Sequence, residues 1–127
     1  MDREVVVRTV PGGPYRNEVV AGPHRWTADG GTDIGGGDAS PGPFDMLLGA
    51  LGACTTMTVT MYAARKGWPL RGVEVRMTRD PEKGIRRTIR FEGDLDGEQR
   101  KRLLEVADKC PVHKALVGGT PVATEPA

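Results

Sequence analysis

One long stretch without charge constrains the fold of this chain more than any other feature. No residue between Asp45 and Arg65 carries a charge, and the segment is rich in leucine, methionine, alanine and threonine. Pro43 suits the first turn of a helix, basic residues from Arg65 onward suit the last turn, and Gly67 can end it in a left-handed conformation. The pattern predicts a helix over 44–66.

A helix that is apolar on nearly all sides either crosses a membrane or lies inside a core. The length of this one is near the minimum for a membrane span. It carries four threonines and two glycines, however, and it has no aromatic belt. We therefore expect a helix buried at the centre of a protein core, with no membrane association. No basic segment precedes an apolar run at the N-terminus, so we also expect a cytoplasmic protein without a signal peptide.

Shorter segments on both sides of this helix follow the alternating pattern of strands. The part before it is rich in valine and is broken by Pro-Gly-Gly-Pro and Gly-Pro turns. After it, apolar and polar residues alternate on both sides of a turn at Asp80–Gly84, with Ile89, Phe91 and Leu95 on one side of the second segment. The strands predicted before the helix are 3–10, 15–21 and 24–28.

Two further helices are predicted in the last third of the chain. Asp96 is a good N-cap, and Gln99 three residues later completes a capping box. Pro111 stops this helix and can begin a second one. The predicted elements are a helix from Gly97 that carries Leu103, Val106, Ala107 and Cys110 inward, a short helix over 111–118 and a last strand over 120–125. Strands are segregated from helices, which is typical of an α+β fold.

Length and charge narrow the class of protein. The chain has 127 residues, which predicts a single domain over 1–127, and its net charge of +1 gives no electrostatic reason to expect nucleic acid. The glycine-rich segment 29–43 lacks the Gly-Lys-Ser/Thr of a phosphate-binding loop, so we interpret it as a connection. One small sheet covers only one side of an apolar helix. We therefore predict a homodimer, in which a second copy covers the rest.

The two cysteines are the candidate reactive groups. If a helix begins at Pro111, Cys110 is its N-cap, where unpaired backbone N–H groups and the helix dipole favour the thiolate. The alternative is a buried cysteine that completes the apolar face of the preceding helix.

Cys54 lies in the middle of the long helix, where no neighbour one turn away is cationic. Apolar burial alone would raise its pKa and leave it unreactive. A reactive Cys54 needs help from elsewhere in the fold, and the candidate cations are Arg16, Arg25, His24 and His113.

A zinc site can also be drawn from these residues. Cys54, Cys110, His24 and His113 are all of ligand type, but only Cys110 and His113 are close in sequence. Structural zinc sites usually contain two closely spaced ligand pairs, so the spacing does not favour a metal.

Two motifs resemble the OsmC/Ohr family, which includes osmotically induced protein C and the organic hydroperoxide resistance proteins. The first runs over 40–55, Ser-Pro-Gly-Pro-Phe-Asp-Met-Leu-Leu-Gly-Ala-Leu-Gly-Ala-Cys-Thr, and the second over 110–116, Cys-Pro-Val-His-Lys-Ala-Leu. Segment 24–31 also resembles the edge strand and glycine loop of that family. The resemblance implies an OsmC-like fold with antiparallel sheets around the long central helix, in an intertwined homodimer.

The same resemblance implies a peroxidase that acts in the response to oxidative stress. Cys54 would be the peroxidatic thiolate that reduces an organic hydroperoxide to an alcohol, and Cys110 would resolve its sulfenic acid as a disulfide. A dithiol or thioredoxin-type reductant would restore both thiols, and no cofactor or metal would be needed. The side chains that would line the site include Leu51, Met57 and Met61.

The chain departs from the well-characterised peroxidases of this family at one position. Those enzymes place a glutamate directly after the proline that Pro43 matches, whereas here that position is Phe44 and the carboxylate is Asp45. On a regular helix Asp45 is about half a turn out of phase with Cys54, so we expect it to act only as a negative charge in the first turn. Two other functions therefore stay open: a small-molecule-binding protein on the same scaffold, and a zinc-stabilised structural module.

Overall fold

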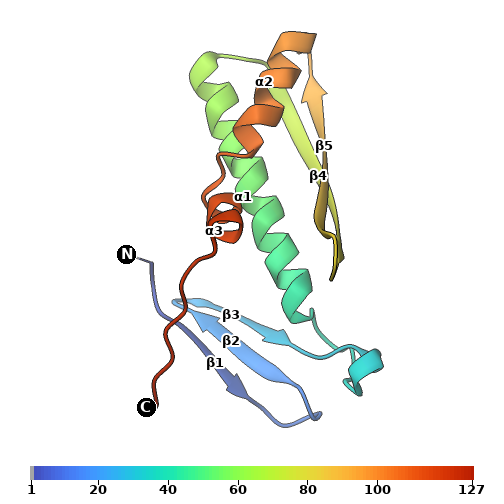
Figure 1. Cartoon of the computed structure of the whole chain (residues 1–127), viewed down its shortest axis with the longest axis vertical. Helices are drawn as coiled ribbons and strands as arrows, with labels where there is room; N and C mark the ends of the chain where they lie inside the picture. The colour runs from blue at the N-terminus through green and yellow to red at the C-terminus, as the bar shows by residue number, and fades with distance from the viewer. Residues whose placement is uncertain (1) are drawn as a thin grey trace. The chain divides into compact units, whose positions relative to one another are not determined.

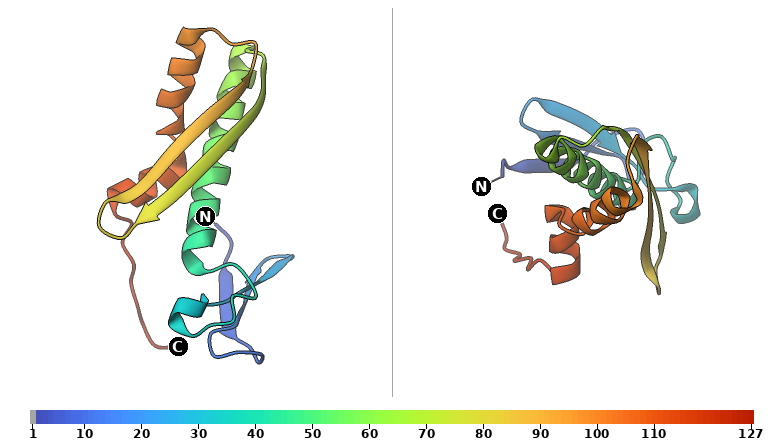
Figure 2. Two further views of the ribbon diagram at one scale, coloured as in Figure 1. Left: turned by 90° about the vertical axis from the view of Figure 1, so that its right-hand side faces the viewer. Right: turned by 90° about the horizontal axis from the view of Figure 1, so that it is seen from above.

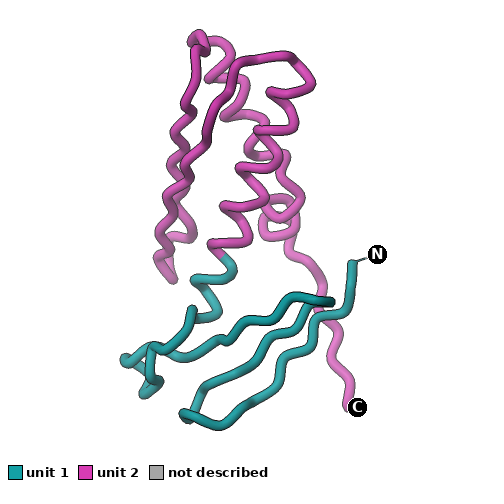
Figure 3. Tube along the Cα trace, turned by 180° about the vertical axis from the view of Figure 1, so that it is seen from behind, with its two compact units in different colours: residues 1–47 teal, residues 48–127 magenta. Residues whose placement is uncertain are grey.

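The computed structural model describes residues 2–127, which form two compact units, one up to Leu47 and one over Leu48–Ala127 (Figure 3). Strands and helices are segregated in sequence, so the predicted α+β class is confirmed (Figure 1). The long helix α1, Pro43–Lys66, begins in the first unit and continues through the second. Each unit is described separately below.

The first unit contains an antiparallel sheet of three strands in the order β1-β2-β3. Val19 of β2 is paired with Val7 of β1 on one side and with Trp26 of β3 on the other. The strands are β1 (Val5–Thr9), β2 (Asn17–Ala21) and β3 (His24–Ala28). All three were predicted, and the third has the predicted bounds.

The glycine-rich segment after β3 is a connection, interrupted by a short 3-10 helix, η1, over Thr32–Ile34. Buried Asp29 organises it, because its carboxylate accepts hydrogen bonds from the backbone N–H of Gly30 at 2.8 Å and of Ala39 at 3.1 Å. These N–H groups hold the pKa of Asp29 below its usual value, and the charge of Arg16 adds to the effect.

Both ends of α1 follow the predicted pattern. At its start, Asp45 accepts a hydrogen bond from the backbone N–H of Gly42 at 2.9 Å, which is the first-turn role expected of it. At its end, Gly67 adopts φ 70°, a left-handed conformation that costs glycine little.

The second unit is a β-hairpin with helices on one face (Figures 1 and 2). Strands β4 (Leu70–Asp80) and β5 (Gly84–Gly93) pair antiparallel, with Val75 opposite Ile89. The other helices are α2 (Gly97–Ala107), with the predicted Asp96–Gln99 capping box, and α3 (Pro111–Gly118).

The core of this unit lies between α1, α2 and the hairpin. It consists of Val59, Ala63, Phe91, Leu95, Leu103, Val106 and Ala107. Leu95 is buried as expected, but it follows β5 rather than belonging to it.

Within the chain, α1 is buried along one stripe and not on all sides. Leu51, Thr55, Val59 and Ala63 recur every four residues on the buried side, whereas Met57 and Met61 are 63% and 52% exposed. The expectation of a helix buried on nearly all sides is therefore met only along this stripe. By length and composition alone α1 is also apolar enough to cross a membrane, a test that the core helix of a soluble protein passes as well.

The predicted strand over 120–125 is wrong. Residues 120–127 form no helix or strand and are exposed along their whole length. A strand needs a neighbour to pair with its backbone, and alternation in a short terminal segment does not supply one.

Candidate active site

The structure brings the two cysteines together within the second unit. Cys54 lies on α1 and is partly exposed, and Cys110 is fully buried at the start of α3. Cys110 is the N-cap of α3, as predicted, and its Sγ accepts a hydrogen bond from the backbone N–H of His113 at 3.4 Å. A partly exposed sulfur beside a buried one is an arrangement in which the first can meet a small molecule and the second can then react with the first.

Hydrogen-bond donors make Cys54 the more acidic thiol. Burial raises the pKa of Cys54, but the Cys110 thiol, the backbone N–H of Val112 and the Thr58 hydroxyl donate to it and together hold that pKa below its usual value. Thr58 also donates to the Cys54 carbonyl oxygen at 2.7 Å, so its single proton is shared between the two acceptors. The sequence interpretation required a cation near Cys54, whereas within this unit the Cys110 thiol, the first turn of α3 and Thr58 supply the stabilisation.

The pKa of Cys110 shifts in the opposite direction, to above its usual value. Burial raises its pKa, and the hydrogen bond to Cys54 and the negative charge of the Cys54 thiolate raise it further. The N–H groups of His113 and Val112 oppose this shift but do not overcome it. The pair therefore loses its first proton mainly from Cys54 and keeps its second on Cys110.

The other candidate cations from the sequence have contacts of their own. His113 contributes its backbone N–H to Cys110, while its imidazole Nδ1 lies 3.9 Å from Asp108. The candidates in the first unit have local roles there: Arg25 pairs with Glu18 at 3.3 Å, and Arg16 lies near Asp29. That Arg16, Arg25 or His24 stabilises the Cys54 thiolate stays a prediction.

Arg87 is a residue near the pair that sequence reasoning missed. From β5 its guanidinium donates to Thr55 Oγ1 at 3.0 Å and to Asp108 Oδ1 at 2.7 Å. These partners lie 32 and 21 residues away in sequence, so no short sequence pattern predicts the contact.

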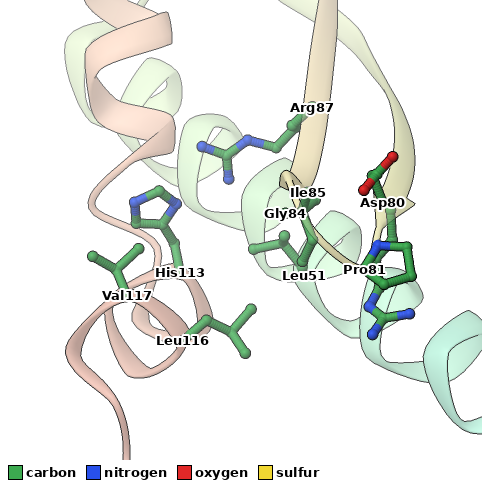
Figure 4. Close-up of a pocket in the computed structure, with 10 residues that line it drawn as sticks. Leu51, Asp80, Pro81, Gly84, Ile85, Arg87, His113, Leu116 and Val117 are labelled. Atoms are coloured by element: carbon green, nitrogen blue, oxygen red, sulfur yellow. The ribbon is translucent and has the colours of Figure 1, made fainter.

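A cavity of about 440 Å³ lies next to Arg87 and His113 (Figure 4). The Arg87 guanidinium extends from β5 toward the His113 ring on α3, above a mainly apolar wall (Figure 4). That wall includes Leu51, Ile85, Leu116 and Val117. Leu51 lines this cavity, but Met57, Met61 and both cysteines do not. That Leu51, Met57 and Met61 line a peroxide site at Cys54 stays a prediction.

The remaining candidate from the sequence is a zinc site. Within residues 2–127, no group of three or more histidine, cysteine, aspartate or glutamate side chains is arranged to hold a metal ion. The zinc site drawn from Cys54, Cys110, His24 and His113 has no such group to support it.

Comparison with known proteins places the chain in a family. The profile of the OsmC-like protein family matches residues 35–125, which include both cysteines. No protein of curated function matches the chain.

Solved structures show the same fold at low sequence identity. An OsmC-like protein from Mycoplasma pneumoniae has a TM-score of 0.74 at 18% identity, over 94% of this chain and 90% of the other. The organic hydroperoxide resistance protein OsmC from Legionella pneumophila gives 0.59 at 20%, over 91% and 90%. The organic hydroperoxide resistance protein OhrB of Bacillus subtilis gives 0.60 at 16%, over 94% and 93%.

The family match covers well over half of the chain, and the fold agrees with it along nearly the whole length. The chain therefore belongs to the OsmC-like protein family.

Proposed function

We propose that the protein is a thiol-dependent peroxidase that reduces organic hydroperoxides to alcohols. The observation that carries the proposal is the opposite shift of the two thiols: the pKa of partly exposed Cys54 is lowered and that of buried Cys110 is raised. The thiolate is the form that attacks a peroxide, so the accessible sulfur is also the reactive one. Some structures of this fold are named organic hydroperoxide resistance proteins, which agrees with this chemistry.

The first step consumes the peroxide. The Cys54 thiolate attacks the terminal oxygen of ROOH, an S–O bond forms, and the O–O bond breaks. Cys54 becomes a sulfenic acid, and the departing alkoxide takes a proton from solvent to give the alcohol.

The second step forms a disulfide. The charge on Cys54 is one cause of the raised pKa of Cys110, and that charge disappears when Cys54 becomes a neutral sulfenic acid. The N–H groups of His113 and Val112 then favour a Cys110 thiolate. This thiolate attacks Cys54 Sγ, an S–S bond forms, and the sulfenic oxygen leaves as water after protonation. A dithiol reductant restores both thiols by exchange and is itself oxidised to a disulfide.

We further propose that the protein acts as a homodimer in the cytoplasm. Met57 and Met61 leave an apolar face of α1 exposed in one chain, and a second copy would cover it. The chain has only two cysteines, too few for a secreted disulfide scaffold, which favours a reducing compartment. Sedimentation analysis would give twice the chain mass if the dimer exists, and a Met57→Glu variant would sediment as a monomer.

A binding protein is the second candidate function. The apolar cavity beside Arg87 and His113 favours it, because small-molecule sites are concave and mainly apolar with a few polar groups.

Turnover of cumene hydroperoxide with dithiothreitol or dihydrolipoamide separates the two functions. A peroxidase turns over in the wild type, loses turnover in Cys54→Ser, and prefers the organic peroxide to hydrogen peroxide. Wild-type rates no faster than the reductant alone would end the peroxidase proposal and favour the binding protein.

A further inference from the structure

We propose that Arg87 is a positioning residue that holds Cys54 and Cys110 at the separation needed to form a disulfide. The consequence of this role for catalysis rests on the proposed function, but the contacts of Arg87 do not depend on peroxide chemistry. Arg87 lies on neither of the elements that carry the cysteines.

One guanidinium contacts a chain neighbour of each cysteine. Nη1 donates to Thr55 Oγ1 at 3.0 Å, and Thr55 directly follows Cys54. Nη2 donates to Asp108 Oδ1 at 2.7 Å, and Asp108 lies two residues before Cys110. A planar guanidinium fixes the relative positions of its two partners, which a flexible ammonium does not.

Both partners are firmly tied to the segments that carry the sulfurs. Thr55 is fully buried, and its hydroxyl donates in turn to the Leu51 carbonyl at 2.7 Å on the same helix. Asp108 begins a tight turn in which the N–H groups of residues 108–110 all donate to carbonyls at the end of α2. A shift of Asp108 therefore moves Cys110 with it.

The guanidinium is itself held in place. The Arg87 side chain is only 12% exposed, whereas Asp108 is 65% exposed. Arg87 also sits within the β4–β5 ladder, opposite Met77. The hairpin thus fixes one end of the side chain, and the two hydrogen bonds fix the other.

Arg87 does not act as the cation that stabilises the thiolate. Thr55 is rotated by about 100° from Cys54 around the helix axis, so the guanidinium lies on a different face of α1. The donors that lower the pKa of Cys54 are Cys110, Val112 and Thr58. Loss of Arg87 should therefore weaken disulfide formation, and it should change the ionisation of Cys54 only through displacement of the donors Cys110 and Val112.

The test is the equilibrium between the reduced protein and its Cys54–Cys110 disulfide in glutathione buffers. Two thiols are oxidised for each glutathione disulfide that is reduced to two glutathione molecules, so no peroxide is involved. We expect the equilibrium constant to fall at least about tenfold in Arg87→Met, because small displacements of reacting groups have large effects. Arg87→Lys keeps the positive charge but loses the planar guanidinium that contacts two partners at once, so the fall in the equilibrium constant should be intermediate.

The control variant is Arg90→Met, on the same strand. Arg90 pairs with Glu74 and Glu92 on the exposed side of the hairpin, so its loss should leave the disulfide equilibrium unchanged. Thr55→Val removes one of the two contacts of Arg87 and should reproduce part of the effect in a protein that keeps the guanidinium. Any shift of the pH profile of Cys54 alkylation should follow the loss in the disulfide equilibrium, also in Thr55→Val, because both depend on the position of Cys110 and the first turn of α3.

Four outcomes test the positioning role and separate it from the proposed function. A disulfide equilibrium in Arg87→Met and Thr55→Val equal to that of Arg90→Met would overturn the positioning role. An alkylation profile that moves to higher pH in Arg87→Met, returns to the wild-type profile in Arg87→Lys and stays at the wild-type profile in Thr55→Val would also overturn it, because the charge of Arg87 would then act directly on the thiolate. A wild type that forms the disulfide yet turns over no peroxide would end the proposed function and leave the positioning role standing. A wild type that forms no disulfide in these buffers would end both.

Discussion

The Cys110 thiol donates a hydrogen bond to Cys54, and this contact moves the pKa values of the two sulfurs in opposite directions. It lowers the pKa of the acceptor, Cys54, and raises that of the donor, Cys110. The order in which the two thiols react in the proposed cycle follows from this single relationship.

Removal of that donor should make Cys54 less acidic. In Cys110→Ala, burial still raises the pKa of Cys54 while one of the three opposing donors is gone, so the pKa should rise. The midpoint of the pH profile for iodoacetamide alkylation should move to higher pH, and the rate at neutral pH should fall. Cys110→Ser keeps a hydroxyl donor and should shift less. An unchanged profile in Cys110→Ala would show that the two sulfurs are not coupled.

The core of the second unit depends on Leu103. This side chain is fully buried between α2 and the rest of the unit, whereas its neighbour Leu104 is half exposed. Leu103→Ala should lower the free energy of unfolding by about 2–5 kcal/mol, through lost burial and the cavity left behind. Leu104→Ala is the matched control and should change it far less. Urea unfolding of both variants measures the difference, and equal losses would contradict the packing described for α2.

The start of α2 depends on a reciprocal cap. The Asp96 carboxylate accepts from the Gln99 N–H at 2.8 Å, and the Gln99 side chain accepts from the Asp96 N–H at 2.9 Å. Asp96→Ala should cost about 1 kcal/mol of stability, and Asp96→Ser should restore most of it. Thermal unfolding followed by circular dichroism is the measurement, with Asp94→Ala as the control outside the cap. Equal losses in Asp96→Ser and Asp96→Ala would argue against capping.

Acid should loosen the loop that Asp29 organises. The pKa of this carboxyl is lowered in the folded state by the N–H groups of Ala39 and Gly30, so its contribution to stability is present above its unfolded pKa. That contribution is lost as the pH falls through the lowered folded value. Protection of the Gly30 and Ala39 amides from hydrogen exchange should therefore fall below about pH 4. Asp29→Asn should show weak protection at every pH, and strong protection in that variant would contradict the role of the carboxylate.

The strands, the start of a helix and one N-cap could be predicted because they depend on local sequence patterns. Turn residues marked the strands of both sheets, the Asp96–Gln99 spacing marked the start of α2, and the Pro111 position placed Cys110 at an N-cap. These features arise from backbone geometry within a few residues, so short patterns suffice to find them.

Features that depend on contacts across the chain escaped prediction. Two of the three donors to Cys54, Cys110 and Val112, lie at the start of α3, more than fifty residues later, and the bridge through Arg87 joins three separate segments. The N-cap argument already placed unpaired N–H groups near Cys110, and the Val112 N–H is one of them. What the sequence lacked was the packing that points this group at Cys54.

The most direct test of the account is mass spectrometry of the protein after one equivalent of cumene hydroperoxide, with dimedone present to trap sulfenic acid. In the wild type we predict a Cys54–Cys110 disulfide, with the loss of two hydrogen atoms and little dimedone adduct. In Cys110→Ala we predict a dimedone adduct on Cys54. The central claim that Cys54 is the peroxidatic thiolate would be contradicted by a wild type that stays fully reduced. It would also be contradicted by a Cys54→Ser variant in which the peroxide oxidises Cys110 as fast as it oxidises the wild type.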